Sequence, residues 1–325
     1  MQAFAQALAA PVVAFVVSVL LVRAFLSGPA RRVFLDHPNP RSLHAAPIPR
    51  AGGLGLMPAA LLGMLIVGGV LPAVLVALAL MLLSLVDDWK GLPAALRLPL
   101  HLAAAVGFVV LQLPGHQWFL TVVLAITIGW MTNLYNFMDG SDGLAGGMAL
   151  IGFGVYAAGA VIGGDFDFAL VNLAIAAAAA GFLVFNFPPA RVFMGDAGSI
   201  PLGFLAGGLG LQGWQDGLWP LWFPVVTFGP FIVDASMTLA RRAVHGEKLW
   251  QAHRTHYYQR LVLSGWSHRR TALWEYGLML FSGATGLIAL GRGELVQALA
   301  FSVLVLVYAG AMVAIDLRWR ARARA

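Results

Sequence analysis

Five carboxylates lie in three short polar segments of a chain that is otherwise dominated by long apolar stretches. The segments read SLVDDWKG, NLYNFMDGSDGLAGG and FNFPPARVFMGDAGS, and the carboxylates are Asp87, Asp88, Asp139, Asp142 and Asp196. A carboxylate at the edge of a hydrocarbon layer is costly unless something there uses its charge. A bound cation or a phosphate-bearing substrate would use it, so these segments are the candidate chemical centre.

Asp87 and Asp88 end an apolar stretch, and therefore a predicted helix. The C-terminal end of a helix carries partial negative charge, which disfavours anions. A bound cation or a general-base role would relieve two adjacent carboxylates at that position. The alternative is a polar helix end that simply meets the membrane interface.

The second segment places amide and carboxylate groups close together, at the end of one predicted helix and in the turn that follows it. Asn133 and Asn136 are three residues apart and hence lie on one face of a helix. Asp139 and Asp142 are each followed by glycine and form a turn, in which Asp142 is able to N-cap the next helix. Hard oxygen donors of this kind suit Mg²⁺, which binds through one or two carboxylates together with substrate phosphates.

The third segment predicts a helix stop followed by a helix start. Pro188-Pro189 ends one helix and the glycine-rich stretch around Asp196 begins another. Backbone amides at such a start attract phosphate, which the Asp196 carboxylate would repel unless a metal bridged the two. Phe193 is a candidate stacking platform for a base, with a membrane-interface anchor as the alternative.

Two basic segments complete the set. HRTHYYQR contains His253, Arg254 and His256, for which recognition of an anion is the preferred interpretation because no further zinc ligand is near in sequence. RSLHAAPIPRAGG is a weaker signal. It carries three basic side chains before two glycines: Arg41, His44 and Arg50.

The elements that must position these residues are membrane-spanning helices. The chain is 60% hydrophobic and 10% charged, with a mean hydropathy of +0.83, which predicts an all-α polytopic membrane protein of one domain, residues 1–325. Breaking the apolar stretches at proline, glycine and charge gives about eleven spans. These are 3–27, 51–69, 71–86, 97–113, 118–137, 143–163, 168–186, 198–213, 218–240, 271–290 and 295–317.

The basic residues predict the orientation. If the N-terminus is outside, 19 of the 20 Lys and Arg residues fall at the cytoplasmic side. The loops on that side are 28–50, 87–96, 138–142, 187–197 and 241–270, and they include all three acidic segments. The count also takes in the tail 318–325, together with Arg23 and Arg97 at the cytoplasmic ends of their spans. Because the positive charge follows one membrane face, the pI near 10.2 does not indicate a nucleic-acid partner. The absence of cysteine excludes disulfides and thiolate chemistry.

The five segments between Arg41 and Arg270 resemble those of the polyprenyl-phosphate N-acetylhexosamine-1-phosphate transferases, in glycosyltransferase family 4. The resemblance lies in their order along the chain and in the side of the membrane on which they fall. The resemblance implies a bacterial inner-membrane enzyme, N-terminus periplasmic and C-terminus cytoplasmic. It would transfer a sugar 1-phosphate from a UDP-N-acetylhexosamine (GlcNAc or a 6-deoxy relative) to undecaprenyl phosphate and release UMP. That step would initiate cell-envelope polysaccharide or O-antigen synthesis. Implied cofactors are Mg²⁺ or, as the alternative, Mn²⁺, and a homodimer is left open.

The same resemblance implies roles for individual residues. Asp196 resembles the magnesium-ligating aspartate, joined by Asn136 and Asp88, and Asp87 resembles the base that faces the lipid phosphate. Phe193 resembles the residue that stacks on uracil. The nucleotide and substrate side is then expected to include Asn133, Asn136, Asp139, Asp142, Asn186, His253, Arg254, His256, His44 and Arg50.

Departures from the family pattern favour its polysaccharide-initiating branch. Gly91 stands where the family often has Asp or Lys, the histidines read His-Arg-Thr-His, and an eleventh span and a basic tail follow. The alternative within the family is the phospho-MurNAc-pentapeptide transferase of peptidoglycan synthesis. A transporter is the alternative from another class, disfavoured because the carboxylates cluster on one face and no repeat is present. Direct attack by the lipid phosphate and a covalent aspartyl intermediate both stay open.

The ninth span holds Pro224, Gly229 and Pro230, which should break or bend it. We hypothesise that the bend opens a lateral groove that admits the polyprenyl chain from the bilayer.

Overall fold

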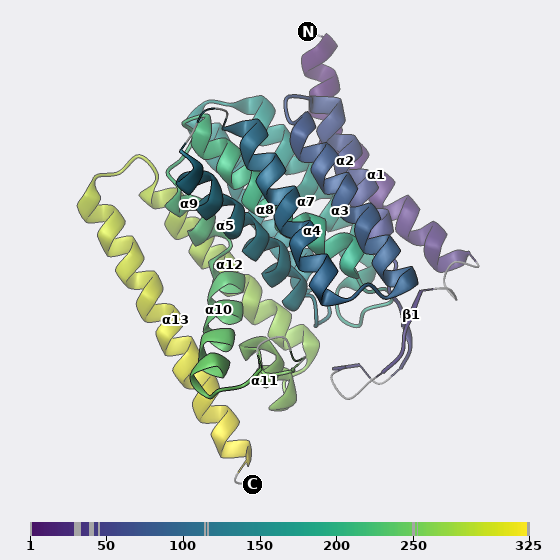
Figure 1. Cartoon of the computed structure of the whole chain (residues 1–325), viewed down its shortest axis with the longest axis vertical. Helices are drawn as coiled ribbons and strands as arrows, with labels where there is room; N and C mark the ends of the chain where they lie inside the picture. Colours follow the sequence, from purple (N-terminus) through teal and green to yellow (C-terminus); the bar gives the residue numbers. More distant parts are fainter. Residues whose placement is uncertain are drawn as a thin grey trace.

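The computed structural model describes residues 2–28, 34–38, 42–44, 46–113, 115, 117–248, 251 and 253–323. Arg41 lies outside them. The regular secondary structure of the described chain is almost entirely helical (Figure 1). The helices are α1 Gln2–Ser27, α2 Gly53–Val67, α3 Leu71–Lys90, α4 Ala94–Gln112, α5 Trp118–Phe137, α6 Leu144–Gly163, α7 Phe166–Asn186, α8 Asp196–Gln215, α9 Trp222–Thr227, α10 Gly229–Val244, α11 Tyr257–Leu263, α12 His268–Ala289 and α13 Glu294–Ala323.

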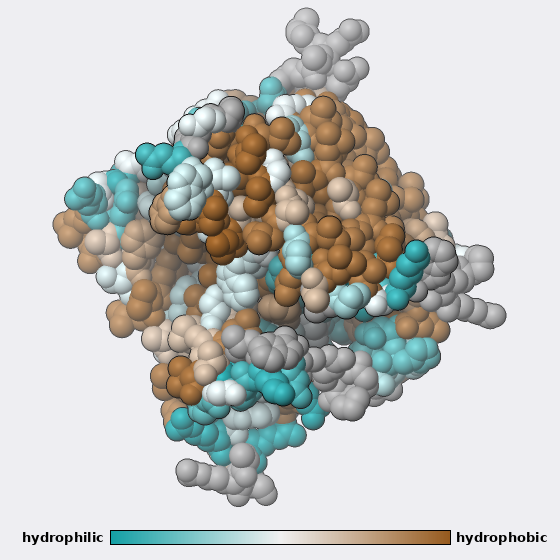
Figure 2. Space-filling view, viewed as in Figure 1, coloured by the Kyte–Doolittle hydropathy of each residue, from teal (hydrophilic) through white to brown (hydrophobic). Residues whose placement is uncertain are grey.

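The predicted all-α membrane architecture is confirmed. Within the described residues, seven helices are long and apolar enough to cross a bilayer, namely α1, α3, α4, α5, α6, α7 and α13. Each predicted span coincides with one helix, except that the ninth coincides with α9 and α10. The two termini lie at opposite ends of the bundle (Figure 1). Brown apolar surface covers the side formed by α2, α3 and α4, while hydrophilic residues gather around α11 and the C-terminal end (Figure 2).

The core of the bundle depends on small side chains. Helix α7 packs against α1, α2 and α6, and α8 packs against α3 and α5. A Cβ added at Gly63 of α2 would come within 2.7 Å of the Ala174 methyl on α7. A Cβ at Gly203 of α8 would come within 2.6 Å of the Met131 carbonyl on α5. Glycine at these positions therefore lets the helices approach closely, which is how helices associate in a membrane.

The break in the ninth span is confirmed. Helix α9 ends at Thr227 and α10 begins at Gly229, with Phe228 as the residue between them. Pro230 occupies the first turn of α10, where its missing N–H costs no intrahelical hydrogen bond. The two glycines that separate the second and third spans, Gly68 and Gly69, both have positive φ, at 90° and 76°.

Three short elements were not predicted. A short antiparallel pair, β1 Leu35–Asp36 and β2 Ile48–Pro49, folds the loop before α2 back on itself. In the loop before α12, residues 257–263 form α11. His253 and His256 precede this helix, because α11 begins only at Tyr257.

Candidate active site

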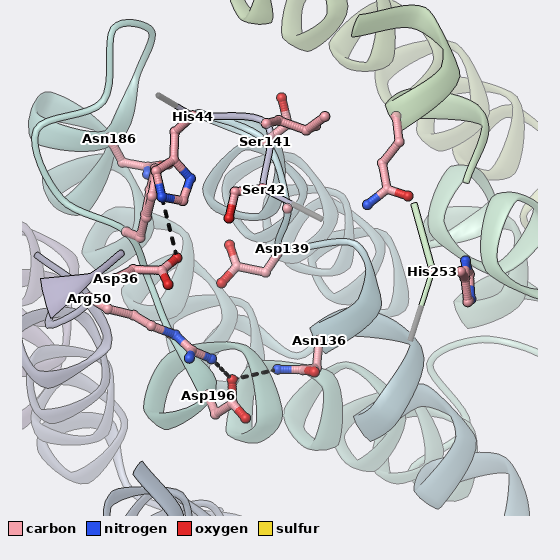
Figure 3. A pocket seen from close by; sticks show the side chains of 15 residues that line it. Asp36, Ser42, His44, Arg50, Asn136, Asp139, Ser141, Asn186, Asp196 and His253 are labelled. Carbon is pink, nitrogen blue, oxygen red and sulfur yellow. Dashed lines mark hydrogen bonds and ion pairs between the residues drawn. The ribbon is translucent and has the colours of Figure 1, made fainter. Parts of the chain in front are cut away.

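The three acidic segments converge at one end of the bundle, as predicted. The second and third segments line a pocket of about 280 Å³ together with the β1–β2 loop and the segment before α11 (Figure 3), and the first segment lies beside this pocket. We call this end of the bundle the site face. The lining residues are Asp36, Ser42, Leu43, His44, Arg50, Asn136, Asp139, Gly140, Ser141, Asn186, Phe193, Gly195, Asp196, His253 and Gln259.

Asp196 is the most heavily contacted carboxylate of the pocket. It is the first residue of α8, preceded by Gly195 with φ 74°. Its Oδ1 accepts a hydrogen bond from the Asn136 amide at 3.0 Å and another from the Arg50 guanidinium (Figure 3). The same Asn136 amide group donates to Ser199 Oγ at 2.9 Å. Helix α5 and the start of α8 are thus joined at this carboxylate.

Arg50 reaches Asp196 because the chain before α2 docks on the loop before α8. Phe193 N donates to the Pro49 carbonyl, and Gly52 N donates to the Phe193 carbonyl, both at 2.8 Å. A Cβ on Gly53 would lie 2.4 Å from Gly198 N. No side chain fits there, so the glycines after Arg50 allow the close approach that brings Arg50 to Asp196. The segment RSLHAAPIPRAGG, a weak signal in the sequence, therefore contributes to the site.

Asp87 and Asp88 lie beside the pocket and are engaged by arginines. Asp87 Oδ2 accepts from Arg97 at 2.6 Å, and Asp87 Oδ1 accepts from Leu92 N at 2.7 Å. The Arg97 guanidinium also lies 3.6 Å from Asp196 Oδ2. Asp88 lies 3.9 Å from Arg50. The charge that the sequence required beside these carboxylates is therefore supplied, in this structure, by two arginines.

The donor set agrees with Mg²⁺ chemistry but is sparse. Among the described residues, no group of three or more His, Cys, Asp or Glu side chains is arranged to hold a metal ion. Asp196 accepts from Arg50 and Asn136, and Asp88 lies 3.9 Å from another nitrogen of the same Arg50 guanidinium, so these side chains surround one arginine. Mg²⁺ needs only one or two protein carboxylates when substrate phosphates supply further oxygens. The residues present fit that kind of site.

Asp139 faces the pocket from the turn after α5. Burial raises the pKa of its carboxyl to about 8, with Asp196 adding to the rise, while Arg50 and the Gly195 amide oppose it. At neutral pH most of this carboxyl is therefore protonated. A cation placed beside it would favour the ionised form.

The histidine segment is held by a carboxylate that the sequence reading missed. Asp234 of α10 is buried, and its Oδ1 lies 3.1 Å from His256 Nδ1. Asp234 also accepts from Tyr257 N at 2.9 Å and from Tyr258 N at 3.0 Å, which caps the start of α11. In the sequence, Asp234 is marked only by being a single carboxylate within a predicted apolar span.

His253 and His256 lie together, with ring centroids 4.8 Å apart. His253 lines the pocket, whereas His256 is buried behind it. Burial, together with the neighbouring His256 and Arg242, lowers the pKa of His253 to about 4, so its ring is neutral at pH 7. Arg254 is exposed and does not line the pocket.

Two of the predicted polar residues support loops. Asn186 accepts from Gly143 N at 2.9 Å and donates to the Val192 carbonyl at 2.8 Å. Asp142 accepts from Ala190 N at 2.9 Å. The N-cap role considered for Asp142 is wrong, because Gly143 takes that position of α6 at φ 75° and no side chain caps the helix.

The remaining predicted residues divide between the pocket and the bundle. Asn133 lies outside the pocket lining, where it donates to the Gly129 carbonyl at 2.7 Å and lies 3.3 Å from His101 Nδ1. His44 and Phe193 form an edge-to-face pair at 4.9 Å on the pocket wall. Asp36, 3.8 Å from His44, was missed because it belongs to the unpredicted β1.

These features define an integral membrane protein with a charged pocket at one end of its helices, the arrangement expected of an enzyme that works at a membrane surface. The model of glycosyl transferase family 4 matches residues 70–213, which hold all three acidic segments. Full-length relatives extend this match over most of the chain. The protein belongs to glycosyl transferase family 4 and is a membrane-bound transferase.

The relatives carry related names. The chain is 30% identical over 290 residues to a probable undecaprenyl-phosphate N-acetylglucosaminyl 1-phosphate transferase of Bacillus subtilis, covering 82% of this chain and 81% of the relative. It is 30% identical over 330 residues to a decaprenyl-phosphate N-acetylglucosaminephosphotransferase of Mycobacterium tuberculosis, covering 82% and 80%. It is 33% identical over 288 residues to a phospho-N-acetylmuramoyl-pentapeptide-transferase of a Synechococcus species, covering 74% and 78%.

Proposed function

We propose that this protein transfers a sugar 1-phosphate from a UDP-N-acetylhexosamine (GlcNAc or a 6-deoxy relative) to undecaprenyl phosphate and releases UMP. The reaction would initiate synthesis of a cell-envelope polysaccharide or O-antigen. The observation that carries the proposal is the meeting of Asp196 with Arg50, Arg97 and Asn136, directly beside Asp87 and Asp88. Phosphoryl transfer requires positioning and charge neutralisation, which such a cluster supplies.

The donor nucleotide is assigned to the pocket. Phe193 and His44 form an aromatic wall on which uracil can stack, and neutral His253 lies at the opposite lining segment. Arg50, which lines the pocket, supplies positive charge for the diphosphate. Mg²⁺, or alternatively Mn²⁺, would be held by Asp196, Asp88 and Asn136, and when bound it would neutralise diphosphate charge.

The acceptor phosphate is assigned to Asp87 and Arg97. A phosphate monoester has a second pKa near 6, so at pH 7 much of the acceptor is already dianionic. Arg97 then orients the acceptor phosphate, and Asp87 takes the remaining proton where one is present. In the preferred mechanism, an acceptor oxygen bonds to the β-phosphorus of the donor while the bond from that phosphorus to the UMP oxygen breaks. A covalent aspartyl intermediate is the alternative.

An apolar cavity supports entry of the acceptor chain near the break in the ninth span. It encloses about 150 Å³ between α5, α8 and α9, and its wall includes Leu124, Leu211, Pro224 and Val225. The cavity lies at mid-depth along these helices, so a chain whose phosphate is at the site face could extend into it.

One experiment tests the function and separates the two branches of the family. Purified protein is incubated with undecaprenyl phosphate, Mg²⁺ and, in turn, UDP-GlcNAc, 6-deoxy UDP-N-acetyl sugars and UDP-MurNAc-pentapeptide, and UMP release is measured. Release with a UDP-N-acetylhexosamine supports the proposal. Release only with the pentapeptide substrate would assign the protein to peptidoglycan synthesis, which the Synechococcus relative makes the second candidate. No release with any donor would overturn both.

The proposed location is the bacterial cytoplasmic membrane, with the site face and the C-terminus in the cytoplasm. Because the chain has no cysteine, single cysteines can be introduced without background. A cysteine at Arg292, in the α12–α13 turn, should react with a membrane-impermeant maleimide from outside the cell. A cysteine at Glu247, beyond α10, should react only after the membrane is opened. The reverse pattern would invert the topology.

A further inference from the structure

A second basic site lies on the site face, away from the pocket, where α11, α12 and α13 meet. A cavity of about 640 Å³ opens there. Its lining combines two arginines with two tryptophans and aliphatic side chains: Leu261, Trp266, Arg270, Leu273, Trp274, Ala311, Ala314, Ile315 and Arg318. None of these residues belongs to the pocket described above.

The two arginines converge on one indole. The guanidinium carbon of Arg270 lies 4.1 Å from the Trp266 ring centroid, and that of Arg318 lies 5.7 Å from it. Arg318 also donates to the Ser264 carbonyl at 3.1 Å. Residues 270 and 318 come from different helices, so their meeting is a product of the fold. Stacking on an aromatic face holds a guanidinium in place and leaves its N–H groups directed outward.

The positive charge of this pair is not balanced within the described chain. Among the described residues, no carboxylate lies within 4 Å of either guanidinium. The neighbouring carboxylate, Asp316, is taken by Arg241 at 2.9 Å and by Arg260 at 2.7 Å. The indole Nε1 of Trp266 is buried and also has no hydrogen-bond acceptor there. The cavity is thus lined by two guanidinium groups that have no carboxylate partner among the described residues.

The position of the cavity indicates what supplies the acceptors. His268, at the start of α12, lies 2.9 Å from Ser141 of the pocket, so this end of α12 is level with the site face. Apolar side chains of α12 and α13 near the cavity are exposed, with Leu273 51%, Trp274 43% and Leu317 62% accessible. Arginine and tryptophan above an apolar surface mark the headgroup level of a bilayer.

We propose that the cavity formed by Arg270, Arg318 and Trp266 binds the headgroup of an anionic phospholipid. The phosphate accepts from the two guanidinium groups, and the acyl chains lie along Leu273, Trp274 and Leu317. Anionic lipid is favoured over zwitterionic lipid because the site holds two unbalanced positive charges. This site is independent of the proposed transfer reaction.

The test uses the full chain, purified in mild detergent, with phosphatidylglycerol or phosphatidylcholine added and lipid retention counted by native mass spectrometry. The variant is Arg270→Gln/Arg318→Gln. The matched control, Arg269→Gln/Arg320→Gln, removes the same charge from exposed residues next to the site. Each basic residue near an anionic lipid contributes about 1 kcal/mol, or about fivefold in affinity. Loss of both should therefore weaken phosphatidylglycerol retention by roughly five- to 25-fold.

Three outcomes would overturn the proposal. The first is equal retention of the two lipids by the wild-type chain, and the second is an equal loss in the control variant, which would indicate diffuse charge. The third is displacement of phosphatidylglycerol by millimolar glycerol phosphate, which would assign the site to a soluble anion. A Trp266→Phe variant, which keeps the aromatic face but removes the N–H, should weaken retention less than Trp266→Ala. Thermal unfolding in detergent identifies any variant that fails to fold, and the phosphatidylglycerol-to-phosphatidylcholine ratio within each variant does not depend on its yield.

Discussion

The Oδ1 atom of Asp234 lies 3.1 Å from Nδ1 of His256, and both side chains are buried. Asp234 comes from α10, after the break in the ninth span, whereas His256 precedes α11. The pair therefore ties the histidine segment of the site to the part of the bundle that bends.

Replacing Asp234 by alanine should detach this segment. The change leaves the Tyr257 and Tyr258 amides without an acceptor, which costs about 2–4 kcal/mol in the free energy of unfolding. Thermal unfolding in detergent measures the loss. Asp167→Ala, at an exposed carboxylate in the first turn of α7, is the control and should change stability by less than about 1 kcal/mol. Equal losses of stability in the two variants would show that the hydrogen bonds from α11 to Asp234 do not stabilise the protein.

Asp196→Asn should lower kcat by about 100-fold or more, because the change removes charge at the proposed metal and diphosphate position. A second readout is binding of Mn²⁺, followed by electron paramagnetic resonance in the absence of substrate. Wild-type protein should bind Mn²⁺ more tightly than the variant, with Asp165→Asn on the opposite face as the control. Full activity in the variant would refute the metal assignment even if the transfer reaction were confirmed.

Arg97→Ala should act on the lipid acceptor more than on the nucleotide donor. Loss of a charged hydrogen bond of about 1.5–3 kcal/mol predicts a rise in KM for undecaprenyl phosphate of roughly ten- to 100-fold. Arg97→Lys keeps the charge but cannot bridge Asp87 and Asp196 in the same way. Its KM for undecaprenyl phosphate should therefore lie between those of the wild type and Arg97→Ala. Steady-state kinetics with each substrate varied in turn separate the two KM values. A selective rise in the KM for the donor would instead place Arg97 at the nucleotide.

Replacing Pro224 and Pro230 together by alanine should straighten the ninth span and reshape the cavity beside Pro224. Loss of contact equivalent to one buried methylene would raise the apparent KM for the lipid about fourfold. A short-chain acceptor that does not reach mid-depth is the control and should show no change. Unchanged kinetics with the long-chain acceptor would refute the groove hypothesis.

The raised pKa of Asp139 predicts a pH dependence of stability. The folded protein keeps this proton up to a pKa of about 8, whereas the unfolded chain loses it near 3.8. The contribution of Asp139 to stability is therefore full below about pH 4 and declines as pH rises toward 8. Melting temperatures in metal-free buffer should fall over this range, and Asp139→Asn, which mimics the protonated group, should flatten the profile. A profile that Asp139→Asn leaves unchanged would show that another group titrates.

Most of the architecture could be predicted because its determinants are local. Apolar stretches of membrane length specify helices wherever they occur, and Gly68-Gly69, Pro188-Pro189 and Gly195 mark helix ends within a few residues of where they fall. Convergence of the acidic segments was also predictable, since alternating spans place every second loop on the same face.

The partners within the site could not be predicted, because each depends on how segments far apart in the chain dock. Arg97 looked like a topological charge, yet it lies between Asp87 and Asp196. Asp142 resembled a helix cap but holds Ala190 instead.

The sequence by itself determined a polytopic membrane protein with carboxylates gathered at one face, because hydropathy and turn residues act over a few neighbouring positions. Only the tertiary structure decided which cation meets which carboxylate. Those pairings follow from the close approach of α2, α4, α5 and α8, which rests on glycines such as Gly53 and Gly203 whose missing side chains leave room for a neighbouring backbone.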